Sequence, residues 1–221
     1  MERTIQYSDN NLIIQQVLSK FSFSLLFMTI GMIVGALLVP PGVAALMPLV
    51  CLFALFGAFI VRRNKREDGQ FTLSMGFVYG FAALMGVGLY PTMLYYTQTI
   101  GANLVMTALG VTFILFFGLA FYASHTERNF LNLGSMLFGG LLALILVSIV
   151  GIFIQATALE IAITTGGLFI FSGYVLYDIQ LMRSGFVTEA DVPMLVLNLF
   201  LDFINLLLYV LRLIGIVASD D

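Results

Sequence analysis

The sequence predicts an all-α integral membrane protein, a bundle of seven transmembrane helices, on three observations. Of its 221 residues, 61% are hydrophobic and only 10% are charged, and its mean hydropathy is +1.06. Soluble globular domains carry about 25% charged residues. The apolar residues gather in long stretches, and a helical span needs about 20 mostly apolar residues. The alternation of period two that marks an outer-membrane barrel is absent.

Seven stretches meet the length requirement, and no linker or low-complexity block divides them, so we expect one domain over residues 1–221. Residues 1–20 form a polar, cytoplasmic tail whose scattered apolar residues favour an interfacial helix. Pro91 interrupts the third stretch, and Asp202 and Arg212 interrupt the seventh. The expected spans are about 21–39, 43–61, 72–95, 103–123, 131–154, 161–182 and 194–217.

The basic residues predict the topology, because cytoplasmic connections of membrane proteins carry an excess of Lys and Arg. The chain has nine Lys and Arg in total. With a cytoplasmic N-terminus, all of them except Arg212 fall in the tail or in connections on the cytoplasmic side. The other connections, at about 40–42, 96–102 and 155–160, hold none. We therefore expect the N-terminus inside and the C-terminus outside.

Asp178 and Asp202 lie within the sixth and seventh predicted spans. A carboxylate at bilayer depth is costly, so it usually faces the bundle interior or a wet cavity and marks an ion or proton pathway. The short connection 183–193 makes the two helices antiparallel neighbours. Two carboxylates in contact cannot easily both ionise, so a shared proton would hold the helices together. Its loss would favour separation or entry of a cation such as Ca²⁺, which prefers oxygen ligands.

The seventh span also carries a polar stripe. Its members recur at spacings of four and three residues, which places them on one helix face that should point inward. The members are Asn198, Asp202, Asn205, Tyr209 and Arg212. For the two Asn and the Tyr, interhelical hydrogen bonding is the ordinary interpretation. Arg212 either pairs with an acid of the stripe or, as we favour, reaches the outer surface.

Arg62 opens the basic run 62–66 at the inner end of the second span. Such a run ordinarily fixes topology and binds anionic headgroups. Arg62 differs from its neighbours because it directly follows the apolar AFIV and is placed to pair with a carboxylate on the cytoplasmic side. In the third span, Gly76 and Gly80 have GxxxG spacing, which predicts close helix packing.

Other sites for chemistry are scarce. Cys51 and His125 are the only residues of their types, so neither a disulfide within the chain nor a histidine metal site is expected. We expect Cys51 to pack within a span and His125 to be solvated in a loop. Glycine-rich phosphate loops and HExxH motifs are missing. Asp178 and Asp202 lack the Gly-any-Gly-Asp context of intramembrane aspartyl proteases, which weakens that alternative without eliminating it. We expect no enzyme activity, no cofactor and no nucleic-acid partner.

Two segments resemble a known family. SGYVLYDIQLM (172–182) and NLFLDFINLLLYVLRLIG (198–215) are similar to the Bax inhibitor-1 family, also called the transmembrane BAX inhibitor motif family, and within it to the bacterial calcium-leak members. The resemblance implies a pH-sensitive gate formed by two aspartates of the last two helices, and an arginine at the end of the second helix that latches onto one of them. Matched by motif, Asp178 and Asp202 are the gate and possible Ca²⁺ contacts, and Arg62 is the latch.

The chain departs from the family in two places. Some bacterial relatives carry an acidic residue within the second helix, whereas residues 43–61 contain none, so an ion path that depends on it is not transferred. Eukaryotic members often end in a basic tail, whereas this chain ends with Asp220 and Asp221. Other bacterial relatives are connected with membrane-bound proteases, which supplies a second interpretation.

Three functions follow from these observations. The leading expectation is a pH-sensitive Ca²⁺ leak channel in a bacterial plasma membrane, with Ca²⁺ as the transported ion and lipids, Ca²⁺ and protons as partners. The main rival is a non-conducting regulator that binds another membrane protein, such as a quality-control protease. A proton-coupled transporter is the third.

Overall fold

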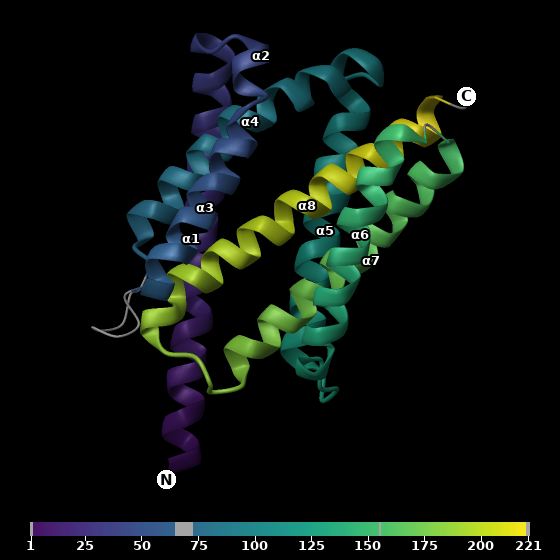
Figure 1. Ribbon diagram of the computed structural model, residues 1–221. Helices are drawn as coiled ribbons and strands as arrows, with labels where there is room; N and C mark the ends of the chain where they lie inside the picture. The colour runs from purple at the N-terminus through teal and green to yellow at the C-terminus, as the bar shows by residue number, and fades with distance from the viewer. Residues whose placement is uncertain (1, 65–72, 155, 220–221) are drawn as a thin grey trace. The chain divides into compact units, whose positions relative to one another are not determined.

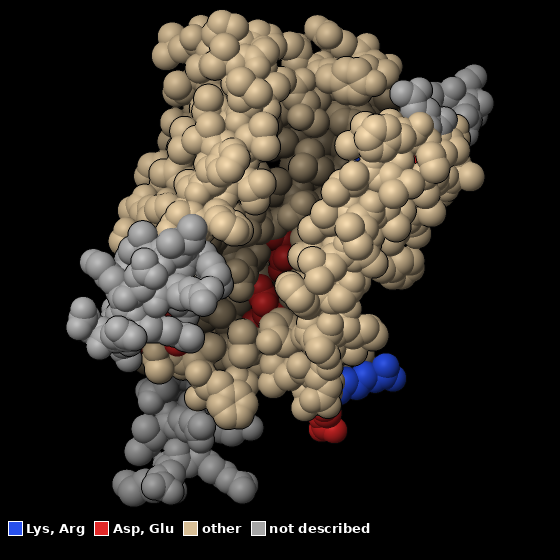
Figure 2. Space-filling view, in the orientation of Figure 1, with Lys and Arg blue, Asp and Glu red and all other residues tan. Residues whose placement is uncertain are grey.

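The computed structural model describes residues 2–64, 73–154 and 156–219, with side chains for 12–58, 73–154 and 156–218. Over these residues the elements are helices, and seven of them are long and apolar enough to cross a membrane (Figure 1). The predicted all-α class and the seven spans are confirmed. The face drawn in Figure 2 is mostly uncharged, as expected of helices that face lipid.

The chain divides into two compact units. The first unit is Met1–Tyr95 with Val187–Phe200, and the second is Tyr96–Phe186 with Leu201–Asp221. The expectation of a single domain stays a prediction. The helices of the first unit are α1 (Glu2–Leu38), α2 (Pro41–Ala44), α3 (Met47–Asn64), most of α4 (Met75–Thr99), η3 (Glu189–Asp191) and the start of α8 (Val192–Ser219). Those of the second unit are α5 (Ala102–His125), η2 (Leu131–Leu133), α6 (Gly134–Phe153), α7 (Thr157–Arg183) and the rest of α8.

Helix α1 is longer than the span expected from residue 21. It runs without a break from Glu2, so the predicted cytoplasmic tail continues the helix. The reason is visible in the sequence, since residues 2–30 contain neither glycine nor proline to end a helix. Ile13, Val17 and Phe21 are buried and recur every four residues, so one face of this extension packs against protein.

Glycines bring α1 and α4 of the first unit into close contact. A Cβ added at Gly31 would lie 2.0 Å from the Ala83 carbonyl oxygen, and one at Gly86 would lie 2.0 Å from that of Met28. Small residues permit such a backbone approach between membrane helices. Gly76 was expected in this role together with Gly80, but an added Cβ would meet nothing closer than 3.8 Å at the first and nothing within 4 Å at the second. The GxxxG prediction for that pair is wrong, because no other helix comes within 4 Å of a Cβ added at either position, as far as the described residues show.

Pro91 does not end the third span. Helix α4 continues through it to Thr99, because membrane helices tolerate a proline where neighbouring groups satisfy the backbone. The preceding Tyr90 donates its hydroxyl hydrogen to the Val39 carbonyl oxygen at 2.7 Å. This bond ties α4 to the residue that follows α1.

In the second unit, α7 packs against both α5 and α6 (Figure 1). Its C-terminal turns are fixed by two side chains. The Gln180 amide donates to the Arg128 carbonyl oxygen and accepts the Phe130 N–H at 2.5 Å. Arg183 Nη1 donates to the Ala123 carbonyl oxygen at 3.0 Å, near the end of α5. The backbone around Asp178 is therefore held in place from both sides of the α5–α6 connection.

Helix α8 is the most buried span. Two-thirds of its apolar window (67%) is buried, against 11–39% for the other six spans. Apolar side chains such as Leu199, Phe200, Leu206 and Leu211 have 0% exposure. A polar group on the buried faces of this helix, such as Asp202, is consequently enclosed by protein.

Candidate functional site

The two aspartates singled out by the sequence both lie in the second unit. Asp178 is near the C-terminal end of α7, and Asp202 is in the N-terminal half of α8. Their exposed fractions are 3% and 5%. The structure therefore places both carboxyl groups inside the protein and away from lipid, as expected of ionisable groups at membrane depth.

The two carboxyl groups are close enough to interact electrostatically with one another. Tyr174, one helical turn before Asp178, interacts with both. Asp202 Oδ2 is fully buried and has no hydrogen-bond partner among the described residues. A buried carboxylate oxygen left without a partner is costly, so this oxygen is available for a proton or a cation.

The surroundings of the pair are apolar. Phe203, next to Asp202, packs on Phe113 and Phe116 of α5 with ring centroids 5.0 and 5.5 Å apart. Val175 and Ile179, on either side of Asp178 along α7, are 0% and 2% exposed. Charge–charge interactions are stronger in such an environment than in water. Once one carboxyl group of the pair is ionised, ionising the other is therefore unfavourable.

The polar stripe of α8 is only partly inward. Asp202 is buried, whereas the other four members are half-buried. The Asn205 amide donates to the Leu201 carbonyl oxygen of its own helix at 2.8 Å. Tyr209 joins α8 to α7 through its ring: it stacks on Phe171 at 5.9 Å, and a Cβ at Gly167 would come within 2.4 Å of its Cζ. The hydrogen bond described for Asn205 stays within α8, so it is not the interhelical bond that was expected.

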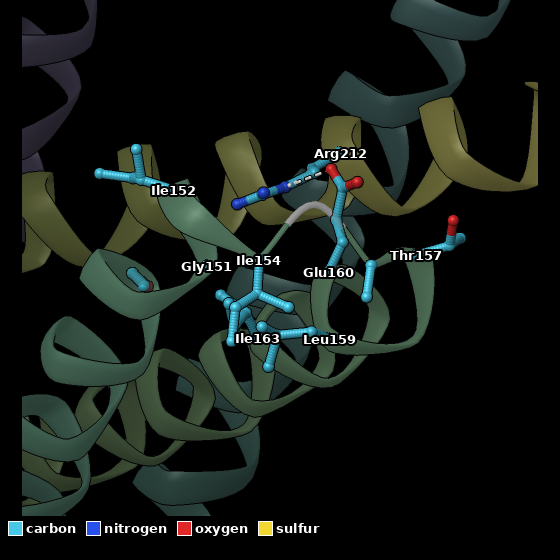
Figure 3. Close-up of a pocket in the computed structure, with 10 residues that line it drawn as sticks. Gly151, Ile152, Ile154, Thr157, Leu159, Glu160, Ile163 and Arg212 are labelled. Atoms are coloured by element: carbon cyan, nitrogen blue, oxygen red, sulfur yellow. Dashed lines mark hydrogen bonds and ion pairs between the residues drawn. The ribbon is translucent and has the colours of Figure 1, made fainter.

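Arg212 has a partner that the sequence analysis did not consider. Its Nε donates to Glu160 Oε1 at 2.9 Å, and the two side chains face one another across α7 and α8 (Figure 3). Glu160 is not in the stripe, so the alternative of pairing with a stripe acid is corrected. That Arg212 reaches the outer surface, the alternative we favoured, stays a prediction, and its side chain is 39% exposed. The available signal was its position: an acid in the first turn of α7 comes to the same end of the bundle as Arg212 near the end of α8.

Arg62 lies on α3, which belongs to the first unit, and its side chain is outside the described residues. The latch therefore stays a prediction. Cys51 is buried, as expected. His125 is exposed, as expected, but it is the last residue of α5, where its Nδ1 lies 2.9 Å from the Phe121 carbonyl oxygen.

A metal cage built from side chains alone is not seen. The described residues include no group of three or more His, Cys, Asp or Glu that could hold a metal ion. Ca²⁺ takes 6–8 oxygen ligands as a rule. A Ca²⁺ ion at Asp178 and Asp202 would thus complete its shell with water or carbonyl oxygens.

Residues 10–219 match the model of the family described as "Inhibitor of apoptosis-promoting Bax1". The chain belongs to this family. The resemblance carried by the segments around Asp178 and Asp202 is thereby confirmed at the level of the family. The match does not separate the calcium-leak members from the others.

Relatives of the chain come from bacteria and from a virus. An uncharacterized protein of Helicobacter pylori strain J99 is 29% identical over 207 residues, which cover 91% of this chain and 85% of that protein. An uncharacterized membrane protein of Vibrio cholerae is 28% identical over 181 residues, 81% of this chain and 79% of that protein. The Golgi anti-apoptotic protein of vaccinia virus strain Lister is 29% identical over 175 residues, 76% of this chain and 70% of that protein.

Proposed function

We propose that this multi-pass membrane protein is a pH-sensitive Ca²⁺ leak channel of a bacterial plasma membrane, gated by Asp178 and Asp202. One observation carries the proposal: two carboxyl groups, 3% and 5% exposed, interact inside the second unit, and one of their oxygens has no described hydrogen-bond partner. A structural role does not need two buried acids, because replacing such groups by apolar residues is often neutral or stabilising. The proposal includes no catalysed reaction, and Ca²⁺ is the transported ion.

The proposed gate works through one proton. With a single shared proton, the pair carries one charge and α7 and α8 stay together. Raising the pH removes that proton and leaves two like charges in apolar surroundings, which is unfavourable. Separation of the helices, entry of water, or entry of Ca²⁺ relieves the repulsion. On the pair alone, the leak therefore increases as the pH rises.

Arg62 adds a restraint in this proposal. Paired with the single negative charge of the pair, it would hold the cytoplasmic ends of the helices closed. Full protonation of the pair removes that charge, so the latch predicts an increase in leak as the pH falls. The two parts of the gate thus have opposite signs, and mutation of Arg62 separates them.

A second candidate is a regulator that conducts no ions and binds another membrane protein. The observation that favours it is the relative from vaccinia virus, whose name describes an anti-apoptotic protein of the Golgi. In that case the buried pair would set the conformation that a partner recognises.

The test is Ca²⁺ flux through the purified full-length protein in vesicles loaded with a Ca²⁺-sensitive dye, over a pH series. We expect flux above that of empty vesicles, with a pH dependence that is lost in the double variant Asp178→Asn/Asp202→Asn. Absence of flux with folded protein would favour the regulator. Flux that stops without an opposing proton gradient would favour the proton-coupled transporter.

A further inference from the structure

A cavity of about 520 Å³ lies at the end of the second unit where α6 ends and α7 begins. Its volume is within the range of ligand pockets, about 300–1,000 Å³. One wall is apolar and includes Ile154, Leu159 and Ile163, and the other carries the Glu160–Arg212 pair (Figure 3). The cavity is separate from the aspartate pair, since Asp178 and Asp202 are not among its lining residues.

The ion pair leaves polar groups free to bind a ligand. The contact joins Arg212 Nε to Glu160 Oε1, and neither the two terminal nitrogens of the guanidinium nor Glu160 Oε2 has a hydrogen-bond partner among the described residues. The side chains are 39% and 43% exposed. In Figure 3 the far end of the guanidinium points away from the carboxylate. The cavity thus offers a donor fork and an acceptor side by side.

These charges select the class of ligand. An Arg fork matches the oxygens of a phosphate, but the adjacent Glu160 carboxylate repels a simple anion. A ligand with a phosphate next to a primary ammonium satisfies both groups, because the ammonium donates to a carboxylate. A quaternary ammonium has no N–H to donate and matches less well.

The position indicates the source of the ligand. Beside the cavity, Ile152, Phe153 and Ile154 are exposed apolar side chains at the end of a membrane-spanning helix. In a bilayer, such side chains would contact acyl chains, whereas Glu160 in the first turn of α7 and Arg212 in the last third of α8 would lie at headgroup level. A soluble zwitterion would gain nothing from this apolar wall.

We propose that this cavity binds the phosphoethanolamine headgroup of a membrane phospholipid, with Arg212 on the phosphate, Glu160 on the ammonium, and the acyl chains along the exposed end of α6. The site does not depend on the proposed channel function. In the predicted topology the cavity faces the outer leaflet. The phosphatidylethanolamine content of that leaflet would then affect how firmly the ends of α6, α7 and α8 pack together.

The experiment uses purified full-length protein in detergent and binding of dihexanoyl-phosphatidylethanolamine, measured by calorimetry or native mass spectrometry. The chain has no tryptophan, so intrinsic tryptophan fluorescence is not a readout. The comparison ligands are the phosphatidylglycerol and phosphatidylcholine of the same chain length, and free phosphoethanolamine. We expect the phosphatidylethanolamine to bind best.

Two variants and one control test whether Arg212 and Glu160 recognise the headgroup. Arg212→Gln should weaken phosphatidylethanolamine binding by about tenfold, the scale of one lost charge-assisted contact. The control Arg128→Gln removes an exposed positive charge from the α5–α6 connection and should change nothing. Glu160→Gln should switch the preference towards phosphatidylglycerol, because Arg212 is then unopposed. A folding defect cannot produce that gain of binding.

Other outcomes overturn the proposal. Equal affinity for the three lipids in the wild type would show that the charged pair does not recognise the headgroup. Free phosphoethanolamine binding as tightly as the lipid would assign the cavity to a soluble zwitterion. Retention of full affinity by Arg212→Gln, or no change of preference in Glu160→Gln, would remove the pair from the site.

Discussion

The two ends of the α7–α8 pair differ in the sign and the exposure of their charged side chains. At one end, Asp178 and Asp202 are both acidic and are 3% and 5% exposed. At the other end, Glu160 and Arg212 have opposite charges, form a 2.9 Å contact and are 43% and 39% exposed. Along α7 the two acids are about 27 Å apart at 1.5 Å per residue. The same two helices thus carry a buried pair of like charges and an accessible pair of opposite charges.

This difference is the reason that we propose a response to pH at the buried end and ligand binding at the accessible end. A buried pair of like charges changes its interaction energy strongly with each proton. An accessible ion pair is screened by solvent and contributes about 0–1 kcal/mol, so its removal changes stability little. Its exposed donors and acceptor are instead available for recognition.

The comparison first requires that the two ends face opposite sides of the membrane. A reporter fused after Asp221 should be outside the cytoplasm, and one inserted between Asn64 and Gly69 should be cytoplasmic, because the basic residues are distributed so unevenly. The result is all-or-none, as read by alkaline phosphatase and green fluorescent protein fusions. Finding both reporters on one side would rule out the predicted orientation of all seven spans.

The next largest effect is expected at the buried pair. Asp178→Asn or Asp202→Asn should each flatten the rise of Ca²⁺ flux between about pH 6 and 8, since one remaining carboxyl group has no like charge to repel it. The double variant should add little to either single variant, because the two residues act as one unit. Flux through vesicles is the measurement, and Glu127→Gln, an exposed acid in the α5–α6 connection, is the control. If both single variants keep the wild-type profile, the gate lies elsewhere.

Removal of the Arg62 side chain should raise the Ca²⁺ leak by about tenfold. Arg62→Ala is expected to raise Ca²⁺ flux at neutral pH and to remove any increase on acidification, because a shielded ion pair of about 1.4 kcal/mol shifts a closed–open equilibrium tenfold. Arg66→Ala, the matched control in the same basic run, should leave flux nearly unchanged. Equal effects of the two substitutions would mean that the run acts through surface charge alone, and the latch would be dropped.

A glycine between the two ends tests whether α7 and α8 must pack tightly. Gly167→Ala brings a methyl group to within 2.4 Å of the Tyr209 ring, and overpacking of this kind costs about 1–3 kcal/mol. Gly110→Ala on α5 meets nothing within 4 Å and should stabilise the helix by up to about 1 kcal/mol. Thermal unfolding in detergent should therefore shift in opposite directions for the two variants; equal shifts would contradict the tight contact.

The smallest effect is expected at the accessible pair. Glu160→Gln should lower the free energy of unfolding by no more than about 1 kcal/mol, because the side chains are more than a third exposed and solvent screens their attraction. Unfolding of the variant at low and high salt measures this contribution, which should vanish at high salt. A loss of several kcal/mol would show that the pair is structurally essential and would remove the contrast with the buried aspartates.

The sequence predicted several features because each depends on local composition. Seven apolar stretches of sufficient length determine seven helices, whatever their neighbours are. The two acids within spans are recognisable for the same reason, since a charge in an apolar stretch stands out without knowledge of the fold. The motif around Asp178 and Asp202 also identified the family, which the match over residues 10–219 confirms.

Other predictions failed where the answer depends on which helix faces which. GxxxG spacing pointed to Gly76 and Gly80, whereas the close contacts form at Gly31 and Gly86. Spacing alone does not show which face of α4 meets α1. Likewise, the spacing of the α8 stripe predicted one inward face, whereas the structure buries Asp202 and leaves the other four members half-buried.

By itself, the sequence determined the class of protein, the number of helices and the identity of the two acids, because hydrophobicity and charge act residue by residue. Only the tertiary structure decided that Asp178 and Asp202 interact, that Asp202 Oδ2 has no partner among the described residues, and that Arg212 pairs with Glu160. These features join residues of different helices. They depend on helix rotation and axial offset, which are fixed by the packing of many side chains and by no local pattern.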